Sequence, residues 1–271
     1  MEIRFIIQDR EFACDLSEPL EISIPLDFKG DQPNTYNVAK AYSETFRSEE
    51  FTGDTREGGG CNFEIYTLIP HCNGTHTECT GHISLERISV ENTLREILFP
   101  ATLITVEPEK STDTADTYIP EKEENDLLIT EKILKKSLAD TGGYSSEALI
   151  IRTLPNREDK KSRNYMDNQP PYFSTEAMKY LVEKNIRHLL IDVPSVDRTF
   201  DRGKLTSHHI FWNVPPGSNE VNADEHSMRT ITEMVFIPDD ITDGKYLLNI
   251  QIPAFKTDAA PSRIFIYKLK K

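Results

Sequence analysis

The spacing of hydrophobic and polar positions predicts an α/β chain built around a parallel pair of strands. Residues 148–153 and 188–193 are short runs rich in Leu, Ile and Val, the pattern of strands that are buried on both faces. Between them, hydrophobic residues spaced three and four apart follow Ser174, a favoured residue for the start of a helix. A strand, a helix and a second strand in this order favour a crossover between parallel neighbours.

Shorter patterns predict the elements on either side of this unit. Residues 2–16 alternate hydrophobic and polar positions around Gln8 and Asp9, as in a β-hairpin. Residues 130–139 place hydrophobic side chains on one helical face behind Thr130, which we expect to cap the helix. Further strands are expected over residues 20–26, 62–68, 101–106, 233–237, 246–255 and 263–268.

The remaining sequence offers no boundary between domains. Residues 108–125 are acidic and lack periodicity, so we expect a solvated loop inserted between elements. No linker and no internal repeat divides the sequence, and 271 residues can bury one sizeable core. We therefore predict a single domain over residues 1–271.

The composition excludes some classes of binding partner and indicates a cellular compartment. The net charge of −14 opposes binding to nucleic acid or to an anionic membrane. No hydrophobic run approaches the ~20 residues that span a bilayer, and charges interrupt the N-terminal run, unlike a signal peptide. Four cysteines without regular spacing do not form a disulfide framework. We expect a cytoplasmic protein that acts on a small molecule.

Candidate chemistry is concentrated between residues 68 and 83. Six side chains there can bind a transition metal or transfer a proton: His71, Cys72, His76, Glu78, Cys79 and His82. The Gly and Thr residues among them are poor helix formers, so we expect a strand end or a tight loop. In an extended segment, residues two apart point to the same face. The side chains expected to converge are therefore Cys72, His76, Glu78 and His82.

Three interpretations of this cluster compete. A thiolate, an imidazole and a carboxylate together suit zinc, and they suit manganese or iron less well. Alternatively, Cys72 or Cys79 is a nucleophile activated by His76 or His82. In the third interpretation, the histidines only cap backbone groups of a polar loop. Metal binding is favoured if further ligands occur elsewhere, because so many competent side chains in one short segment are unusual.

Residues 72–82 also resemble the metal-binding motif of the cyclase-family hydrolases, which include kynurenine formamidase and isatin hydrolase. The family motif is H-x-G-T-H-x-D-x-P-x-H, and the chain reads Cys-Asn-Gly-Thr-His-Thr-Glu-Cys-Thr-Gly-His. The matching residues are Gly74, Thr75, His76 and His82, whereas Cys72, Glu78 and Thr80 replace the family's His, Asp and Pro. Cys and Glu can still bind a metal, so the resemblance implies an altered site in a divergent member. It also implies the fold, a single mixed-sheet domain of the swivelling β/β/α type.

The resemblance implies a second group of ligands in the C-terminal half. His208, in Leu-Thr-Ser-His-His-Ile-Phe, and Glu233, at the start of a hydrophobic strand, match the family's His and Glu. Their long separation implies an inserted loop over residues 213–224. His209 is then expected in the core or beside a ligand, and His226 on the surface. The implied metal ligands are Cys72, His76, Glu78, His208 and Glu233.

The resemblance finally implies an activity. Zinc, with manganese as the alternative, would be held with a position open to water, and the resulting hydroxide would attack a carbonyl carbon. His82 has no ligand position in the family motif and would act as general acid and base. The expected substrate is a small amide, either an aryl formamide such as N-formylkynurenine or a cyclic amide. The expected assembly is a homodimer or a larger homo-oligomer. Two alternatives are a non-catalytic member that binds a metal or ligand and a hydrolase with a cysteine nucleophile.

Overall fold

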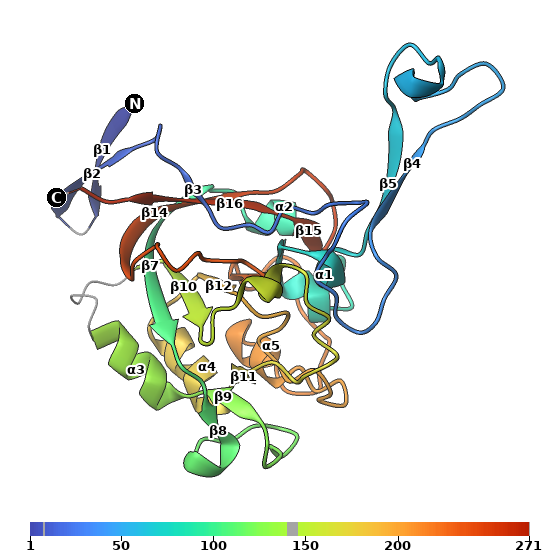
Figure 1. Ribbon diagram of the computed structural model, residues 1–271. Coiled ribbons are helices and arrows are strands. Elements are labelled where there is room, and N and C mark those ends of the chain that lie inside the picture. The colour runs from blue at the N-terminus through green and yellow to red at the C-terminus, as the bar shows by residue number, and fades with distance from the viewer. Residues whose placement is uncertain (8, 140–145, 271) are drawn as a thin grey trace.

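The centre of the fold is β10 (Ala148–Thr153), a strand with all six residues buried, in a large mixed sheet of the computed structural model (Figure 1). The structure describes residues 1–7, 9–139 and 146–270. The strands of the large sheet lie in the order β15 (Ala259–Pro261), β6 (His76–Glu78), β13 (Thr230–Glu233), β12 (His188–Ile191), β10, β7 (Leu98–Val106), β14 (Gly244–Gln251), β16 (Arg263–Lys268) and β3 (Leu20–Glu21). This arrangement is the α/β mixed sheet that the sequence predicts.

The predicted strand–helix–strand unit is confirmed. β10 pairs in parallel with β12 and with β7, and β12 pairs in parallel with β13. The crossover from β10 to β12 contains α4 (Thr175–Glu183), and the Ser174 hydroxyl accepts a hydrogen bond from the Ala177 N–H at 3.0 Å. The other pairs of the large sheet are antiparallel. The parallel centre needs helical cover, because its strands have no exposed face.

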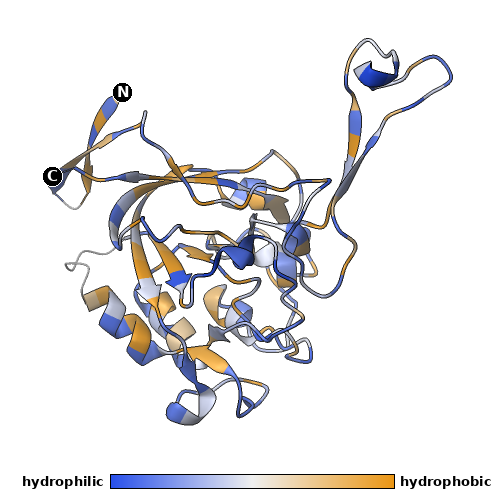
Figure 2. Ribbon diagram, in the orientation of Figure 1, coloured by the Kyte–Doolittle hydropathy of each residue, from blue (hydrophilic) through white to orange (hydrophobic). Residues whose placement is uncertain are grey.

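Alternate side chains of β10 enter two different cores. Leu149 and Ile151 belong to the core under the helices, together with Leu134 of α3 (Glu131–Ala139), Met178 of α4 and Phe211 of α5 (Thr206–Phe211). Ala148 and Ile150 belong to a second core, formed with side chains of β14 and β16 where the sheet curls. Figure 1 shows α3, α4 and α5 together on one side of the sheet, and Figure 2 shows the hydrophobic residues concentrated in the central strands. Burial on both faces explains the nearly continuous hydrophobic runs.

The two outer elements expected from periodicity are confirmed. The N-terminal hairpin consists of β1 (Glu2–Ile7) and β2 (Arg10–Asp15), and Gln8 lies outside the described residues. The helix predicted over residues 130–139 is α3, and the Thr130 hydroxyl accepts a weak hydrogen bond from the Ile133 N–H at 3.4 Å. The remaining helices, α1 (Pro70–Asn73) and α2 (Val90–Thr93), are single turns.

Two predicted strands are shorter than expected. Residues 20–26 form β3 and a single bridge from Ser23 to Val235, and beyond it the Ile24 N–H donates to the Thr75 hydroxyl at 2.8 Å instead of to a neighbouring strand. Residues 246–255 end as a strand at Gln251, ahead of Pro253, which has no N–H to donate.

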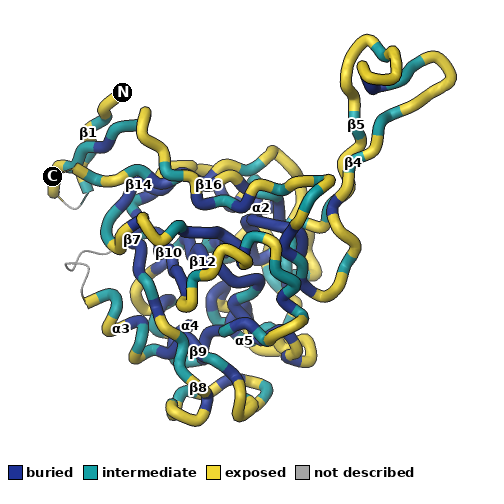
Figure 3. The backbone as a smooth tube through the Cα atoms, in the orientation of Figure 1, coloured by how far each residue is buried: buried dark blue, intermediate teal, exposed yellow. Residues whose placement is uncertain are grey.

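The strand predicted over residues 62–68 is present but lies outside the large sheet. β5 (Glu64–Thr67) pairs only with β4 (Tyr42–Thr45) among the described strands, and together they form an arm that projects from the body (Figure 1). Figure 3 shows that most of this arm is exposed. The arm leads directly into α1, so its base fixes where the candidate site begins.

The segment over residues 108–125 is packed rather than fully solvated, which corrects the expectation from its acidity. It contributes β8 (Glu109–Lys110) to a small sheet with β9 (Leu127–Ile129) and β11 (Tyr172–Phe173). Tyr118 is 4% exposed and donates a hydrogen bond to Asp197 at 2.7 Å. A buried aromatic ring therefore attaches the segment to the body. Residues 213–224 contain no helix or strand, as expected for a loop. Whether either segment is an insertion, and whether residues 1–271 form a single domain, stay predictions.

None of the helices in the described ranges has the length and hydrophobicity that a bilayer crossing requires.

A buried ion pair joins the ends of the two central strands. The Asp192 carboxylate, which follows β12, accepts hydrogen bonds at 2.8 Å from the Thr153 N–H, the Thr153 hydroxyl and the Lys160 ammonium. Both charged side chains are at most 4% exposed. The pair fixes the start of the turn that leads from β12 to Asp197 and the candidate site.

We expect Asp192→Asn to lower the free energy of unfolding by about 3 kcal/mol, because the Lys160 charge would stay buried without its partner. Urea unfolding measures the change. Glu57→Gln, which removes an exposed ion pair with Arg47, is the matched control and should leave the midpoint nearly unchanged. Equal, small effects of the two substitutions would contradict a structural role for the buried pair.

Candidate metal centre

Strand β6 places two predicted ligands beside a third. In the antiparallel register, His76 lies opposite Glu233, and Glu78 lies opposite Ile231. Directly opposed residues share one face of the sheet, so His76, Glu78 and Glu233 project to the same side. His76 Nε2 lies 3.4 Å from Glu233 Oε2. His76 and Glu78 are fully buried and Glu233 is 4% exposed.

Glu233 ends a strand instead of beginning one, which corrects the sequence expectation. It is the last residue of β13, and Met234 after it has a left-handed backbone with φ of 54°. The Thr75 hydroxyl donates to the Met234 carbonyl at 2.5 Å, and the Val196 N–H donates to Glu233 Oε1 at 3.0 Å. The turn is thus held by its neighbours, and the carboxylate at the strand end is oriented by a backbone donor.

Helix α5 brings His208 from the C-terminal half onto Glu78. His208 Nε2 lies 2.9 Å from Glu78 Oε1, and its Nδ1 lies 2.5 Å from Asp197 Oδ2. Asp197 also accepts hydrogen bonds from the Ser207 N–H at 2.6 Å and the His208 N–H at 3.2 Å, so it caps the first turn of α5. One carboxylate therefore fixes both the helix and the ring orientation of His208. The neighbouring His209 is buried, and its Nδ1 has no hydrogen bond to any described residue.

The predicted extended path through residue 72 is wrong, because residues 70–73 form the helical turn α1. This turn rotates His71 toward the site, although the alternation of an extended strand would point it away. His71 Nδ1 lies 3.0 Å from Glu78 Oε2, and its Nε2 lies 3.0 Å from Asp258 Oδ2. Cys72 is 6% exposed and close enough to Glu233 for that carboxylate to affect its pKa. Its assignment as a ligand stays a prediction.

The two thiols of the 68–83 segment, Cys72 and Cys79, are poorly suited to act as nucleophiles. Burial raises the pKa of Cys72 to about 11, with a further contribution from Glu233, and burial raises the pKa of Cys79 to about 11. Cys79 Sγ donates to the Ile88 carbonyl at 3.6 Å. Neither thiol forms a hydrogen bond with a histidine within the described ranges, whereas an activated cysteine needs a base or a nearby positive charge. These observations oppose a cysteine nucleophile.

Strong charge interactions connect the buried residues. Burial alone would raise the pKa of Glu78, but His82 and His208 hold it well below its usual range. Burial alone would lower the pKa of His208, but Glu78 and Asp197 hold it well above its usual range. Burial would likewise lower the pKa of His71, but the contacts with Asp258 and Glu78 raise it to about 10. The site therefore concentrates negative charge that attracts protons or a cation.

One buried atom in the centre, His76 Nε2, has no hydrogen bond in the described part of the chain, and Glu233 Oε2 lies 3.4 Å from it. His76 Nδ1 lies 3.0 Å from the Gly74 carbonyl, so Nδ1 bears the proton and Nε2 presents a lone pair. Asp197 orients the ring of His208 in a similar way, through its contact with Nδ1. Imidazole lone pairs beside buried carboxylates are the donors that zinc binds. The residues present therefore fit a metal ion.

His82 is partly exposed, with 27% of its side chain accessible, and His71 is exposed to the same extent. Its Nδ1 lies 3.4 Å from Asp258 Oδ2 and 3.9 Å from Glu78 Oε2. Its ring centroid lies 4.3 Å from that of His71 and 6.5 Å from that of Trp212. Among the predicted site residues, His82 is thus placed between the buried centre and solvent.

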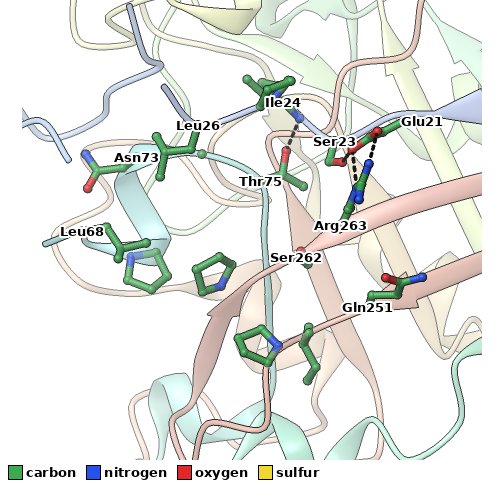
Figure 4. A pocket seen from close by; sticks show the side chains of 16 residues that line it. Glu21, Ser23, Ile24, Leu26, Leu68, Asn73, Thr75, Gln251, Ser262 and Arg263 are labelled. Atoms are coloured by element: carbon green, nitrogen blue, oxygen red, sulfur yellow. Dashed lines mark hydrogen bonds and ion pairs between the residues drawn. The ribbon is translucent and has the colours of Figure 1, made fainter. Parts of the chain in front are cut away.

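A cavity of about 770 Å³ borders Arg198 and Asp201, on the segment that follows Asp197. Tyr36 lines it together with Phe200 and Leu205. Burial raises the pKa of Tyr36 to about 12, and the negative charge of Glu233 contributes to the shift, so the phenol lies within electrostatic reach of the centre. A second cavity, of about 660 Å³, borders Thr75 and the Glu21–Arg263 ion pair, and Figure 4 shows its lining.

The sequence predictions omit four residues that the structure places in or beside the site. They place His71 on the opposite face, and they do not include Asp197, Trp212 and Asp258. Asp197 could have been found, because a carboxylate that closes a turn ahead of a histidine-bearing helix can cap that helix. Asp258 lies in the connection to the edge strand β15, and no local pattern indicates where such a connection passes.

Comparisons with known proteins place these residues in a family. A family model described as "Putative cyclase" matches residues 14–198. A kynurenine formamidase of Bacillus cereus is 25% identical over 233 residues, which cover 86% of this chain and 92% of that enzyme. The structure of isatin hydrolase A from Labrenzia aggregata superposes with a TM-score of 0.59 and 14% identity, covering 92% of this chain and 93% of that one. A "predicted metal-dependent hydrolase" from Bacillus stearothermophilus gives a TM-score of 0.56 and 16% identity, covering 92% and 98%.

Proposed function

Because the chain belongs to the cyclase family and is similar to its hydrolases, we propose that it hydrolyses small amides with the help of a bound metal ion. The observation that supports this most strongly is the meeting of His76, Glu78, His208 and Glu233, which come from β6, α5 and β13. Two buried carboxylates beside two imidazoles with fixed tautomers are a costly arrangement without a cation. A purely structural cluster would not require the unpaired lone pair of His76.

We propose that His76, Glu78, His208 and Glu233 hold the ion, with Cys72 as the fifth ligand. Zinc is the favoured metal because of the imidazole and thiol donors, and manganese is the alternative. A metal bound here would lower the pKa of a coordinated water and polarise a substrate carbonyl. Asp197 keeps His208 in the tautomer that binds, and Gly74 does the same for His76.

His82 is proposed as the general acid and base. Its partial exposure allows a substrate to reach it, and its Nδ1 lies 3.4 Å from Asp258 Oδ2, at the edge of the buried centre. A carbon–nitrogen bond can break only when the departing nitrogen gains a proton, and an imidazole beside the metal can supply it. His82 therefore moves the proton while the buried residues bind and orient.

The proposed substrates are aryl formamides such as N-formylkynurenine, or cyclic amides. The names of the similar proteins support these classes, since they include a kynurenine formamidase and an isatin hydrolase. The cavity beside Tyr36 and Phe200 supports them as well, because its aromatic side chains can stack on a planar ring.

The projecting arm supports a proposal of a homodimer. A two-stranded hairpin alone is marginally stable in water. Here it exposes Tyr42, Phe63, Ile65 and Tyr66, each by more than 40%. A second copy of the chain is the simplest cover for these side chains. The cytoplasm is proposed as the compartment, in keeping with the four free cysteines.

Metal content tests the ligand set. We expect purified protein to contain close to one or two zinc or manganese ions per chain and to lose amide hydrolysis after chelation. Cys72→Ser and Glu233→Gln should each reduce the metal content severalfold, as measured by elemental analysis, because each removes a donor. His226→Gln, outside the site, is the control and should retain the metal. Wild-type metal content in both site variants would show that the ligand assignment is wrong.

Turnover tests the role of His82. We expect His82→Ala to lower kcat on an aryl formamide by about 10²-fold or more, because no other group would deliver the proton. Metal content should not change, since His82 is not a proposed ligand. His226→Ala is the matched control and should have wild-type kcat. Full turnover by His82→Ala on every amide that the wild type hydrolyses would exclude the acid–base role.

Sedimentation tests the role of the arm. We expect wild-type protein to have twice the 31.0 kDa mass of the chain. The double substitution Ile65→Glu and Tyr66→Glu should shift it toward monomer, because charges would replace exposed apolar contacts. Ile6→Glu alters a residue of equal character on the N-terminal hairpin and should leave the mass unchanged. A dimer that persists in the double variant would assign the interface to another surface.

A further inference from the structure

A single carboxylate oxygen contacts two histidines at the solvent side of the centre. Asp258 Oδ2 lies 3.0 Å from His71 Nε2 and 3.4 Å from His82 Nδ1. The two rings lie 4.3 Å apart with an interplanar angle of 33°. Both ion-pair contacts of the Asp258 carboxylate in the described ranges are therefore with site histidines, and neither is with a lysine or arginine.

The backbone around Asp258 is fixed independently of this carboxylate. The Cys79 N–H donates to the Asp258 carbonyl at 3.0 Å, which attaches the connection before β15 to the end of β6. The Val90 N–H donates to the neighbouring Thr257 carbonyl at 2.8 Å. Main-chain hydrogen bonds hold Asp258 at the edge of the site. Its carboxylate is not needed to fix the backbone and can contact the histidines.

Close packing at Gly81 brings the two segments together. A Cβ on Gly81 would lie 2.0 Å from the Ile88 carbonyl oxygen and 3.2 Å from the Asp258 Cβ. Only a residue without a side chain allows the turn that contains His82 to approach the connection this closely. The approach places His82 Nδ1 within reach of the carboxylate.

We propose that Asp258 is a positioning residue that fixes the ring orientation and tautomer of His82. Acceptance of the Nδ1–H proton by Oδ2 leaves Nε2 of His82 as the nitrogen with a lone pair. The same oxygen accepts the Nε2–H of His71, so His71 is held with its Nδ1 against Glu78. Close contacts of 3.0 to 3.4 Å then run from Glu78 through His71 and Asp258 to His82. The effect of Asp258 on catalysis rests on the proposed function, whereas its effect on the His82 tautomer does not.

Kinetics of Asp258→Ala test the proposal with an aryl formamide as substrate. We expect kcat to fall at least tenfold while KM changes less than twofold and metal content is unchanged, because the acid–base group is misaligned but the ligands remain. Asp258→Asn keeps an acceptor oxygen and should retain more activity than Asp258→Ala. Asp31→Asn, at a carboxylate that is 90% exposed, is the matched control and should behave like wild type. Loss of the metal in Asp258→Ala would overturn the proposal, because Asp258 would then maintain the metal site itself.

Nitrogen NMR of ¹⁵N-histidine-labelled, zinc-loaded protein provides a readout without turnover. The His82 resonances are identified by their absence in His82→Gln. We expect wild-type His82 to be protonated at Nδ1 alone, and Asp258→Ala to lose this single tautomer. If the wild type hydrolyses no amide, the proposed function fails and the tautomer still decides the role of Asp258. An unchanged His82 tautomer in Asp258→Ala would overturn the proposal whatever the activity.

Discussion

The burial of two carboxylates on one face of a short antiparallel ladder is the constraint on which the rest of the site depends. Glu78 and Glu233 are almost completely inaccessible, and taking a carboxylate out of water is costly unless opposite charge accompanies it. The imidazoles of His71, His76 and His208 surround them within 2.9 to 3.4 Å. Such a concentration of donors and acceptors is stable when a cation or shared protons balance it. This balance is what a metal-dependent hydrolase requires.

Each element that carries a residue of the site is held in position by contacts of its own. Register sets His76 opposite Glu233, a capped helix directs His208 onto Glu78, and the turn α1 supplies His71. The parallel core behind these elements is buried on both faces and leaves them little freedom to shift. The proposed proton transfer is assigned to His82, which is partly accessible to solvent. Metal binding is thus proposed for the buried residues of the site, and proton transfer for a partly exposed one.

Sequence patterns identified the elements whose structure is decided locally. β10, α4 and β12 follow from continuous hydrophobic runs and from Ser174 as a cap, and the metal-binding motif was visible because its residues are rare and adjacent. Features that depend on tertiary contacts were not predictable. Residues 70–73 form a turn despite an extended-looking sequence, which reversed the expectation for His71. Glu233 ends its strand because Met234 is held in a left-handed conformation by contacts with distant segments. Asp258 lies at the site only because it directly precedes β15, the edge strand in the C-terminal part of the chain.

Anomalous diffraction from crystals of zinc-supplemented protein tests the central claim most directly. Data collected on either side of the zinc absorption edge locate the ion without reference to activity. The account predicts a zinc peak about 2.0 to 2.3 Å from His76 Nε2, from His208 Nε2 and from a carboxylate oxygen of Glu78 or Glu233. A map in which these side chains keep their positions while zinc is absent from the space between them would contradict the account.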